Sequence, residues 1–377
     1  MDRRLRVGVV GGRRGLTLAR QCQMVGMEVV AICDLDRSRL SSASSALGAV
    51  PYQDYDAFLA HDMDGVILAN FFDAHAPLAI EALKAGKHVM SETAACKTFA
   101  EGVQLLRTVE QTGGVYLFAA NYPFKPHVRE LRRLYQAGEV GTFQYGECEY
   151  LHGFSPDYLT QFGEEPRHWR SRVSSLAYCT HSITPVMYVT DTLPTEVSAF
   201  VIPSDSSPES LDAARRGRGI AAVMLIRMDT GAYLKSLHGF LQGEQEPETS
   251  WIRIHGSRGL LENLRHGDSR RVRVRKEEWT TPSGQVEDTV HDPVWDRGDD
   301  ALVCESFARA MQTGEPPYFD VYRGVIASLV GICGLRSLLR GSVPVVIPDL
   351  RQENVRHEYE SDDWNGLEGP SALLFPE

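Results

Sequence analysis

The beginning of the chain carries the feature that most constrains its fold, a short apolar run that breaks into glycines and continues as a helix. Residues 5–11 read LRVGVVG, and the following LTLARQCQMVG has helical periodicity. A second apolar run, MEVVAICD, ends at Asp34, about 20 residues after the glycines, where dinucleotide-binding βαβ units accept a ribose 2′-hydroxyl. The pattern predicts a strand, a glycine turn, a helix and a second strand that together bind a dinucleotide.

The glycine turn departs from the usual G-x-G-x-x-G spacing, whose second glycine lets the backbone approach a pyrophosphate. The residues of the turn are Gly11, Gly12, Arg13, Arg14 and Gly15. A plain strand–helix turn is the alternative, but the turn, the helix and Asp34 occur together, which favours a dinucleotide site. Arg13 or Arg14 is then a candidate for contact with phosphate. Asp34 would repel the 2′-phosphate of NADP, so NAD is favoured; the alternative role of Asp34 is a helix N-cap.

Strand-like and helical segments continue to alternate as far as residue 121. They read DGVILAN, PLAIEALKAG, KHVMSE, FAEGVQLLRTVEQTG and GVYLFAAN. Such alternation predicts a parallel sheet covered on both faces. The second half has strand-like runs separated by turn residues, among them EVSAFVIP, IAAVMLIRM and RRVRVRK, whose alternating charges predict an exposed sheet face. Because 377 residues exceed one ordinary core, we predict two domains, residues 1–122 and 123–377.

Charge and hydropathy exclude several classes of partner. The net charge of -11 repels polyanions and anionic lipid, so nucleic acid is not expected as a partner. We expect no apolar run of the ~18–20 residues that cross a bilayer, and MDRRLRVGVVGG has no signal-peptide core, which predicts a cytoplasmic protein without membrane contact. The seven scattered cysteines show no C-x-x-C spacing and are expected to be reduced core thiols.

A second candidate site lies in the apolar stretch LAYCTHSITPVM, residues 176–187. Tyr178 and His181 are three residues apart and would share one helical face. Cys179 and His181 would face different sides of a helix without a third ligand nearby, so no metal site is expected. For an isolated pair, a buried tyrosine and a hydrogen-bonded core histidine would be the preferred interpretation.

Three longer stretches resemble the Gfo/Idh/MocA superfamily, the relatives of glucose-fructose oxidoreductase and inositol dehydrogenase. They are ILANFFDAHAPLAIEALKAGKHVMSE, NYPFKP followed by LYQAGEVG, and PPYFDVYRGVIASLVGICGLRSLLRGSVPVVIPD. The resemblance implies an α/β Rossmann domain followed by an α+β substrate-binding and oligomerisation domain with a large, open, mostly antiparallel sheet. Because edge strands need covering, we expect a homodimer or homotetramer through the C-terminal sheet.

Two departures from the family pattern bear on the chemistry. Family dehydrogenases carry Glu-Lys-Pro after the fifth strand, and that lysine helps to remove a hydroxyl proton, whereas this chain has Glu92, Thr93 and Ala94. The nearby Lys97 is expected to be a solvated surface charge. The family's later Asp-x-x-x-His pattern is also altered, because Ala177 stands four residues before His181.

The segment Tyr178-x-Thr180-His181 instead resembles the Tyr-x-Thr-His motif of the NAD-dependent glycosidases in this superfamily, the α-N-acetylgalactosaminidase type. The resemblance implies a tightly bound, recycled NAD that takes hydride from sugar C3, so that C2 loses a proton, the C1 substituent is eliminated, water adds and hydride returns. It assigns Tyr178 to the C2 proton and His181 to the C3 hydroxyl, with exchanged roles open. Thr180 is expected to bind substrate.

Polar residues at the strand ends receive roles from the same resemblance, because open α/β sheets bind ligands there. Glu92 is expected near the nicotinamide ribose. Tyr122 and Lys125 are expected to contact the substrate, with a surface position as the alternative for Lys125. The remaining predicted cofactor contacts are Asn70, His75 and Asn121. For His75, helix capping is the alternative.

The segment EEPRHWRSR, residues 164–172, gathers cations and an indole just before the Tyr-His stretch. Its candidate substrate-binding residues are Arg167, His168, Trp169 and Arg170. Guanidinium groups suit carboxylate, sulfonate or sulfate oxygens, and an indole suits the apolar face of a pyranose. An anionic glycoside, such as a uronide or a sulfoquinovoside (the substrate of a sulfoquinovosidase), is therefore a candidate substrate. The alternative is that residues 164–172 form a solvated loop without a binding role.

The sequence thus leads to three functional hypotheses. The first is a glycoside hydrolase that uses NAD as described. The second is an NAD-dependent sugar or cyclitol dehydrogenase in which His181 alone performs the acid–base chemistry. The third is a non-catalytic sensor that binds NAD or a sugar.

Overall fold

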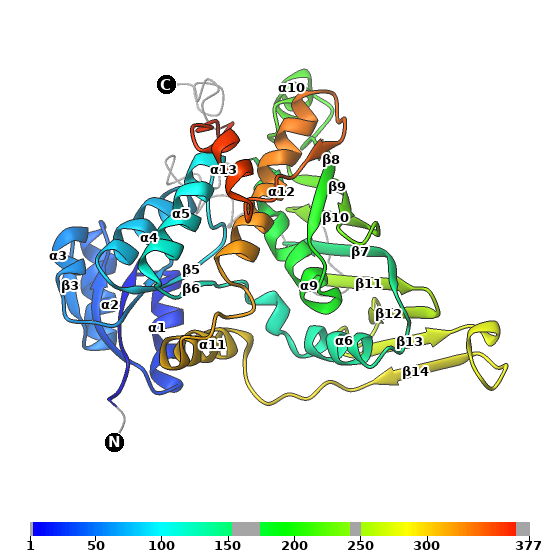
Figure 1. Cartoon of the computed structure of the whole chain (residues 1–377), viewed down its shortest axis with the longest axis horizontal. Coiled ribbons are helices and arrows are strands. Elements are labelled where there is room, and N and C mark those ends of the chain that lie inside the picture. The colour runs from blue at the N-terminus through cyan, green and yellow to red at the C-terminus, as the bar shows by residue number, and fades with distance from the viewer. Residues whose placement is uncertain (1–2, 153–173, 242–249, 367–377) are drawn as a thin grey trace. The chain divides into compact units, whose positions relative to one another are not determined.

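The structure is a computed structural model that describes residues 3–152, 174–241 and 250–366. The chain divides into two compact units, each with its own β-sheet (Figure 1). The first unit comprises residues 1–121, 297–328 and 350–364. The second unit comprises residues 122–296, 329–349 and 365–377.

The sheet of the first unit has six parallel strands in the order β3-β2-β1-β4-β5-β6. Its strands are β1 (Arg6–Val10), β2 (Glu28–Cys33), β3 (Val50–Tyr52), β4 (Gly65–Leu68), β5 (His88–Ser91) and β6 (Tyr116–Phe118). β1, β2 and β4 consist almost entirely of buried residues, as parallel strands covered on both faces do. The strand order reverses between β1 and β4, where doubly wound sheets bind ligands.

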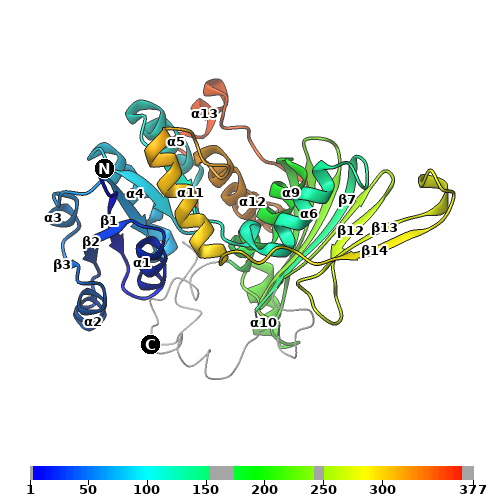
Figure 2. The ribbon, with the colours of Figure 1, turned by 90° about the horizontal axis from the view of Figure 1, so that it is seen from below.

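Helices cover both faces of this sheet. The helices described in this unit are α1 (Arg14–Met24), α2 (Arg37–Leu47), α3 (Tyr55–Leu59), η1 (Phe72–Ala74), α4 (His75–Lys84), α5 (Phe99–Thr112), α11 (Asp299–Thr313) and α13 (Glu353–Tyr359). Figure 2 shows α1 and α2 on one side of the sheet and α4 and α5 on the other. Local sequence sets several helix starts, because Asp36, Asp54 and Thr98 accept hydrogen bonds from first-turn N–H groups.

Helix α11 comes from late in the chain but packs against α1. Cys22 Sγ of α1 lies 3.4 Å from Cys304 Sγ of α11. All seven cysteines are buried free thiols, as predicted. At the contact between α1 and α11, thiols therefore serve as small apolar packing groups.

The second unit is built on a nine-stranded sheet in the order β14-β13-β12-β11-β7-β10-β9-β8-β15. Its strands are β7 (Phe143–Leu151), β8 (Pro194–Ile202), β9 (Ala221–Met228), β10 (Tyr233–Gly239), β11 (Ser250–Gly256), β12 (Gly259–Asn263), β13 (Val272–Lys276), β14 (Glu287–His291) and β15 (Val345–Val346). Among the described strands of this sheet, only β7 and β10 pair in parallel. The predicted fold class, a Rossmann domain followed by an α+β domain with a mostly antiparallel sheet, is confirmed.

Helices α6 (Pro126–Gln136) and α9 (Thr180–Thr190) pack against one face of the second sheet (Figure 2). The shorter helices of this unit are η2 (Tyr122–Phe124), η3 (Ser175–Cys179), α10 (Pro208–Arg215) and η4 (Glu278–Thr280). On β13, Arg273 and Arg275 both pair with Asp288 of β14. The segment RRVRVRK therefore lies on an ion-paired, partly exposed sheet surface, in line with its alternating charges.

Helix α12 (Val321–Leu339) contributes residues to both units. Among the described residues it is long and apolar enough to cross a membrane by length and composition, so the expectation that no run reaches this length is wrong. However, 72% of its most apolar window is buried inside the structure. A helix that is apolar on all sides is also what a protein core requires, and the burial of α12 fits that role.

Candidate functional site

The glycine turn joins β1 to α1 at the switch point of the first sheet. Gly11 has a φ of +98°, and a Cβ at this position would lie 2.6 Å from the carbonyl oxygen of Ala69. A Cβ on Gly15 would lie 2.6 Å from Val9 Cγ1. Both positions therefore require glycine, and the turn presents bare backbone of the kind that a pyrophosphate approaches.

Asp34 lies directly after β2, beside the glycine turn. Its Oδ2 accepts a hydrogen bond from the N–H of Gly12 at 2.7 Å, and its Oδ1 accepts one from the N–H of Asp36 at 2.8 Å. The alternative that Asp34 caps a helix is wrong, because α2 begins at Arg37 and Asp36 is its N-cap. Each carboxylate oxygen has a second lone pair, so Asp34 keeps the capacity to accept hydroxyl donors.

Arg14, the first residue of α1, connects three segments of the first unit. Its Nε donates to Glu92 Oε1 at 2.6 Å, and its Nη1 and Nη2 donate to the two oxygens of Asp300 at 2.6 and 2.7 Å. Burial raises the pKa of Glu92, and the charge of Arg14 opposes this shift without cancelling it. Burial acts to lower the pKa of Arg14, but its bond to Asp300 and the charge of Glu92 raise it overall. A guanidinium predicted to contact phosphate therefore already holds two carboxylates.

His75 is buried at the start of α4. Its Nδ1 lies 3.0 Å from the carbonyl oxygen of Ala94, and its Nε2 lies 3.2 Å from that of Asn70. Burial lowers the pKa of His75. The ring thus links the loop after β5 to the residues that follow β4. The alternative that His75 caps its own helix is wrong, because Ala74 is the N-cap of α4. Contact of His75 with a cofactor stays a prediction.

The other predicted cofactor contacts also lie at this end of the first sheet. Asn121 Nδ2 donates to Asp299 Oδ2 at 3.1 Å. Arg13 is the exposed N-cap residue of α1. Asn70 follows β4, and its buried Oδ1 has no hydrogen-bond partner in the structure. A buried acceptor of this kind is costly unless a ligand or water supplies a donor.

These observations test whether the first unit fits a dinucleotide. Gly11 and Gly15 leave a backbone surface that a Cβ would fill, Asp34 offers acceptors for hydroxyl groups, and Asn70 offers an acceptor that lacks a donor. A dinucleotide brings a pyrophosphate for the first feature, ribose hydroxyls for the second and further N–H or O–H donors for the third. The residues present therefore fit NAD.

The second unit gathers aromatic rings around Tyr178 and His181. Tyr178 belongs to η3 and His181 to the following α9, and their ring centroids are 5.9 Å apart. The chain changes from a 3₁₀ to an α-helix between them, yet the two rings remain neighbours. We use the name ring cluster for Tyr122, Tyr150, Tyr178, His181 and Phe240.

Tyr150 is the centre of the ring cluster and is absent from the candidates drawn from the sequence. Its ring stacks on that of His181 with a centroid distance of 4.6 Å, and it lies 5.0 Å from Tyr122 and 6.1 Å from Tyr178. The alternation of Glu147 and Glu149 with Cys148 and Tyr150 in β7 is a sequence signal that could have placed Tyr150 on the covered face. Only the fold shows that this position meets three functional candidates.

Two further candidates adjoin the ring cluster. Lys125 Nζ lies 4.3 Å from the ring centroid of Tyr122, which is the geometry of a cation–π contact. Thr180 begins α9, is 2% exposed, and accepts a hydrogen bond on its carbonyl oxygen from Thr184 Oγ1 at 2.7 Å. The ammonium of Lys125 thus places a positive charge against the rings, while Thr180 is held inside the helix start.

A buried polar chain follows His181 along α9. Ser182 Oγ donates to the carbonyl oxygen of Cys179 at 2.9 Å and lies 2.7 Å from Ser236 Oγ. Ser236 Oγ lies 3.0 Å from His238 Nδ1. Burial lowers the pKa of His238 to about 3, so the ring is neutral at physiological pH. This chain connects α9 to β10.

Lys97 differs from the sequence expectation. Its Nζ donates to the carbonyl oxygen of Asp73 at 2.7 Å and pairs with Glu101 at 2.5 Å, and its side chain is 23% exposed. The expectation of a solvated surface charge is wrong because Glu101 lies in the first turn of α5 and also accepts from the N–H of Lys97. Lys97 therefore fastens the loop before α5.

Some predicted residues are not placed by the structure. Arg167, His168, Trp169 and Arg170 lie outside the described residues and stay predictions. Among the residues that are described, no group of three or more His, Cys, Asp or Glu side chains is arranged to hold a metal ion. Cys179 is buried beside Tyr178 at the N-cap position of α9.

The parallel sheet with its switch-point glycine turn defines a dinucleotide-binding Rossmann domain, followed by an α+β domain that carries tyrosine and histidine side chains. Residues 5–120 match the family described as the Gfo/Idh/MocA oxidoreductase family with an NAD-binding Rossmann fold. The resemblance inferred from the sequence is thereby confirmed, and with it the class of cofactor. We assign the N-terminal domain to this NAD-binding family.

Relatives and solved structures extend the match over most of the chain. A glycosyl hydrolase family 109 protein of Saccharopolyspora erythraea is 24% identical over 92% of this chain and 83% of its own length. An α-N-acetylgalactosaminidase of Bacteroides fragilis is 27% identical over 49% of this chain and 48% of its own. A levoglucosan dehydrogenase solved with NADH and L-sorbose has a TM-score of 0.76, with 17% identity over 92% of this chain and all of that one. At 17% identity, the likeness to the levoglucosan dehydrogenase shows a shared fold.

Proposed function

We propose that this protein is an NAD-dependent glycoside hydrolase. The observation that carries the proposal is the ring cluster, in which the phenol of Tyr178 and the imidazole of His181 lie 5.9 Å apart. Glycosidic bonds are ordinarily broken by two carboxyl groups. This cluster supplies phenol and imidazole groups instead, and the relatives similar over most of the chain carry glycosyl hydrolase names.

The residues of this chain would divide the work as follows. Bound NAD supplies a reversible hydride acceptor for C3 of the sugar, which makes the C2 hydrogen acidic enough for elimination at C1. His181 accepts the proton of the C3 hydroxyl, and Tyr178 accepts the proton from C2; the exchanged assignment uses the same two groups. Lys125 stabilises negative charge that develops beside Tyr122.

In the first unit, we propose that the glycine turn holds the pyrophosphate and Asp34 the ribose, with Asn70, His75, Glu92 and Asn121 as further contacts. For the phosphate we propose Arg13, the exposed N-cap residue of α1. Tight binding and recycling of NAD follow from a reaction without net oxidation.

We propose a glycoside with an anionic sugar, a uronide or a sulfoquinovoside, as the substrate. The support is the sequence of residues 164–172, whose arginines and indole suit an anionic pyranose. The named α-N-acetylgalactosaminidase relative makes a neutral N-acetylhexosaminide the competing substrate. Anionic glycosides and neutral N-acetylhexosaminides should therefore be compared in the same assay.

The test is incubation of the purified protein with p-nitrophenyl glycosides, neutral and anionic, without added cofactor. We expect release of nitrophenol and free sugar with no net NADH. Accumulation of NADH in step with substrate consumption, without release, would reject the proposal. That result would establish the second candidate, a sugar or cyclitol dehydrogenase, which the likeness to the levoglucosan dehydrogenase structure favours.

We further propose that the protein acts in the cytoplasm as a homodimer or homotetramer that pairs through the open face of the second sheet. Phe200, Leu225 and Tyr233 are 55%, 46% and 42% exposed, and strand register puts them on one face. Such a face is a common association surface. Light scattering of the wild type and of a Leu225→Glu variant tests this, and an unchanged mass in the variant would count against it.

A further inference from the structure

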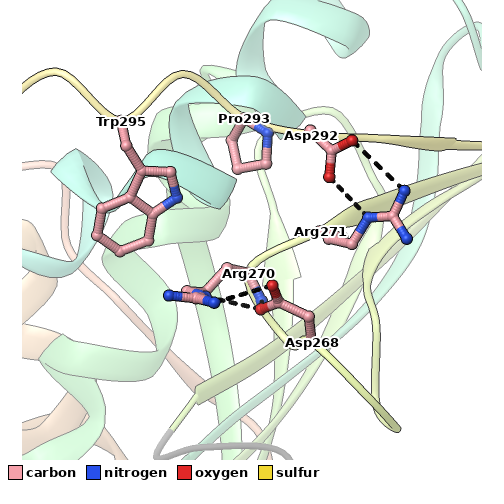
Figure 3. A pocket seen from close by; sticks show the side chains of 6 residues that line it. All are labelled: Asp268, Arg270, Arg271, Asp292, Pro293 and Trp295. Atoms are coloured by element: carbon pink, nitrogen blue, oxygen red, sulfur yellow. Dashed lines mark hydrogen bonds and ion pairs between the residues drawn. The ribbon is translucent and has the colours of Figure 1, made fainter.

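A small pocket in the second unit lies outside the ring cluster. Its walls come from the turn between β12 and β13, which contributes Asp268, Arg270 and Arg271, and from the segment after β14, which contributes Asp292, Pro293 and Trp295 (Figure 3). Its volume is about 230 Å³. That volume suits one sugar ring and is too small for a dinucleotide or an oligosaccharide.

Both walls of the pocket are fixed by the surrounding structure. Asn263 is fully buried, and its Nδ2 donates to the carbonyl oxygens of Ser250 and Ser269, which holds the β12–β13 turn. Arg129 of α6 donates to the carbonyl oxygen of Val294 at 3.2 Å, which holds the other wall. The backbone of both walls is therefore held before a ligand binds, and only the exposed side chains of the pocket would have to be ordered.

The polar groups of the pocket form two neutralised pairs (Figure 3). Arg270 binds Asp268 through Nε and Nη2 at 2.7 and 3.0 Å, and Arg271 Nε binds Asp292 at 2.7 Å. Two arginines and two aspartates give no net charge, so an anionic ligand is not favoured. Asp268 Oδ1 already accepts a second bond, from the N–H of Arg270 at 3.1 Å. Asp268 Oδ2 and the two oxygens of Asp292 each keep a lone pair for a further donor, and hydroxyl groups are such donors.

The apolar part of the pocket is an exposed aromatic surface. Trp295 is 60% exposed, with Arg270 Cζ 5.3 Å from its ring centroid, and Pro293 is buried beside it. An indole presents a flat apolar face with a single N–H donor. The C–H face of a pyranose matches the indole, and its hydroxyls match the Asp–Arg pairs.

We propose that this pocket is a non-catalytic binding site for a neutral hexopyranose unit, through which the protein holds a glycan away from the ring cluster. The site shares no residue with the ring cluster. It does not depend on the proposed hydrolase activity.

The experiment uses the full chain labelled with 5-fluorotryptophan, whose five tryptophans give fluorine resonances assigned by single Trp→Phe variants. The probes are the methyl glycosides of glucose, galactose, N-acetylglucosamine and N-acetylgalactosamine, with glycerol as the control polyol. We expect at least one glycoside to shift the Trp295 resonance saturably. Trp279, which is 77% exposed on η4, is the matched control and should not move.

Two variants sharpen the test. Asp292→Asn keeps the shape of the side chain but removes its charge, and we expect it to weaken binding at Trp295 about tenfold, the factor expected when one charged hydrogen bond is lost. Tyr178→Phe should leave the Trp295 titration unchanged, which separates this site from the proposed active site. The proposal is overturned if no glycoside moves the Trp295 resonance, if Trp279 or glycerol reproduces the shift, or if Asp292→Asn binds like the wild type.

Discussion

The two candidate sites differ in what fixes their functional groups. In the first unit, Asp34 is held by two backbone N–H groups, and Arg14 is held between Glu92 and Asp300. In the second unit, the imidazole of His181 is held by stacking on Tyr150, and rings pack against rings. One site is built from backbone and charge, and the other from aromatic packing.

This difference explains why the two sites leave such different traces in the sequence. The glycine turn and Asp34 fall within one βαβ unit, so their spacing is itself a motif. The ring cluster draws on η2, β7, η3 and α9, which strand pairing and helix packing bring together. The glycine turn and Asp34 can be predicted from a short stretch of sequence. The ring cluster can be predicted from sequence only through resemblance to a family.

The sharpest separation of the two sites is expected from Tyr178→Phe. The ring and its packing stay, but the hydroxyl is lost, so kcat/KM for the best glycoside should fall about 10²- to 10⁴-fold, the range for loss of a general acid–base group. NAD affinity, measured by fluorescence, should stay within about twofold because the change touches only the second unit's chemistry. The matched control is Tyr188→Phe on the following helix, α9; this tyrosine packs on Phe124, and the variant should keep its activity. Equal activity of Tyr178→Phe and the wild type would contradict a catalytic role for the Tyr178 hydroxyl.

The charge network of the first unit can be broken with Arg14→Met. This change leaves the carboxyl of Glu92 without its cation and should lower the free energy of unfolding by about 2–3 kcal/mol at pH 7, less than for a fully buried pair because Arg14 is 37% exposed. The pKa of Glu92 is raised, so folding favours its protonated form and the loss should grow as pH rises above ~4.3. Urea unfolding at several pH values measures this.

The control for that variant is Arg133→Met. Arg133 pairs with Glu130 on α6 at 2.7 Å with its side chain 62% exposed, so the cost should stay below about 1 kcal/mol at every pH. Equal losses for Arg14→Met and Arg133→Met would show that burial of the Glu92 pair does not matter.

The second unit should respond to acid through His238. Its pKa is lowered to about 3 by burial, below the usual ~6.5, so the unfolded chain binds the proton first. Stability is therefore complete above the usual value and falls as pH drops toward 3, by about 2 kcal/mol between pH 7 and pH 5. Replacing His238 by Gln should flatten this slope, as hydrogen exchange of β10 peptides would show; an unchanged slope would contradict it.

The smallest expected effect separates two neighbouring aspartates. Asp34→Asn replaces the charged acceptor for the ribose by a neutral one, so NAD should bind about tenfold more weakly. The preference for NAD over NADP should also become smaller, because the 2′-phosphate of NADP is no longer repelled. Asp36→Asn is the matched control, since asparagine is also a good N-cap for α2 and NAD affinity should not change. Isothermal titration of both variants gives the comparison, and equal affinities would remove Asp34 from the cofactor site.

Several features could be predicted from the sequence because they depend on near neighbours. The strand–turn–helix unit, the need for glycine at Gly11 and the nearness of the Tyr178 and His181 rings follow from local periodicity. Lys97 shows the limit of this reasoning. Its spacing suggested an exposed charge, but Glu101 and the carbonyl of Asp73 surround it once α5 is formed.

By itself, the sequence determined the fold class, the glycine turn beside Asp34 and the Tyr-x-Thr-His segment, because hydrogen bonds and side-chain directions along a short stretch depend on residues only a few positions apart. Only the tertiary structure decided that α11 returns to α1, that Arg14 meets Asp300, and that Tyr150 stacks on His181. These contacts join segments far apart in the chain. They form because burying apolar helix and sheet surface outweighs the entropy of closing long loops, and that balance belongs to the whole fold.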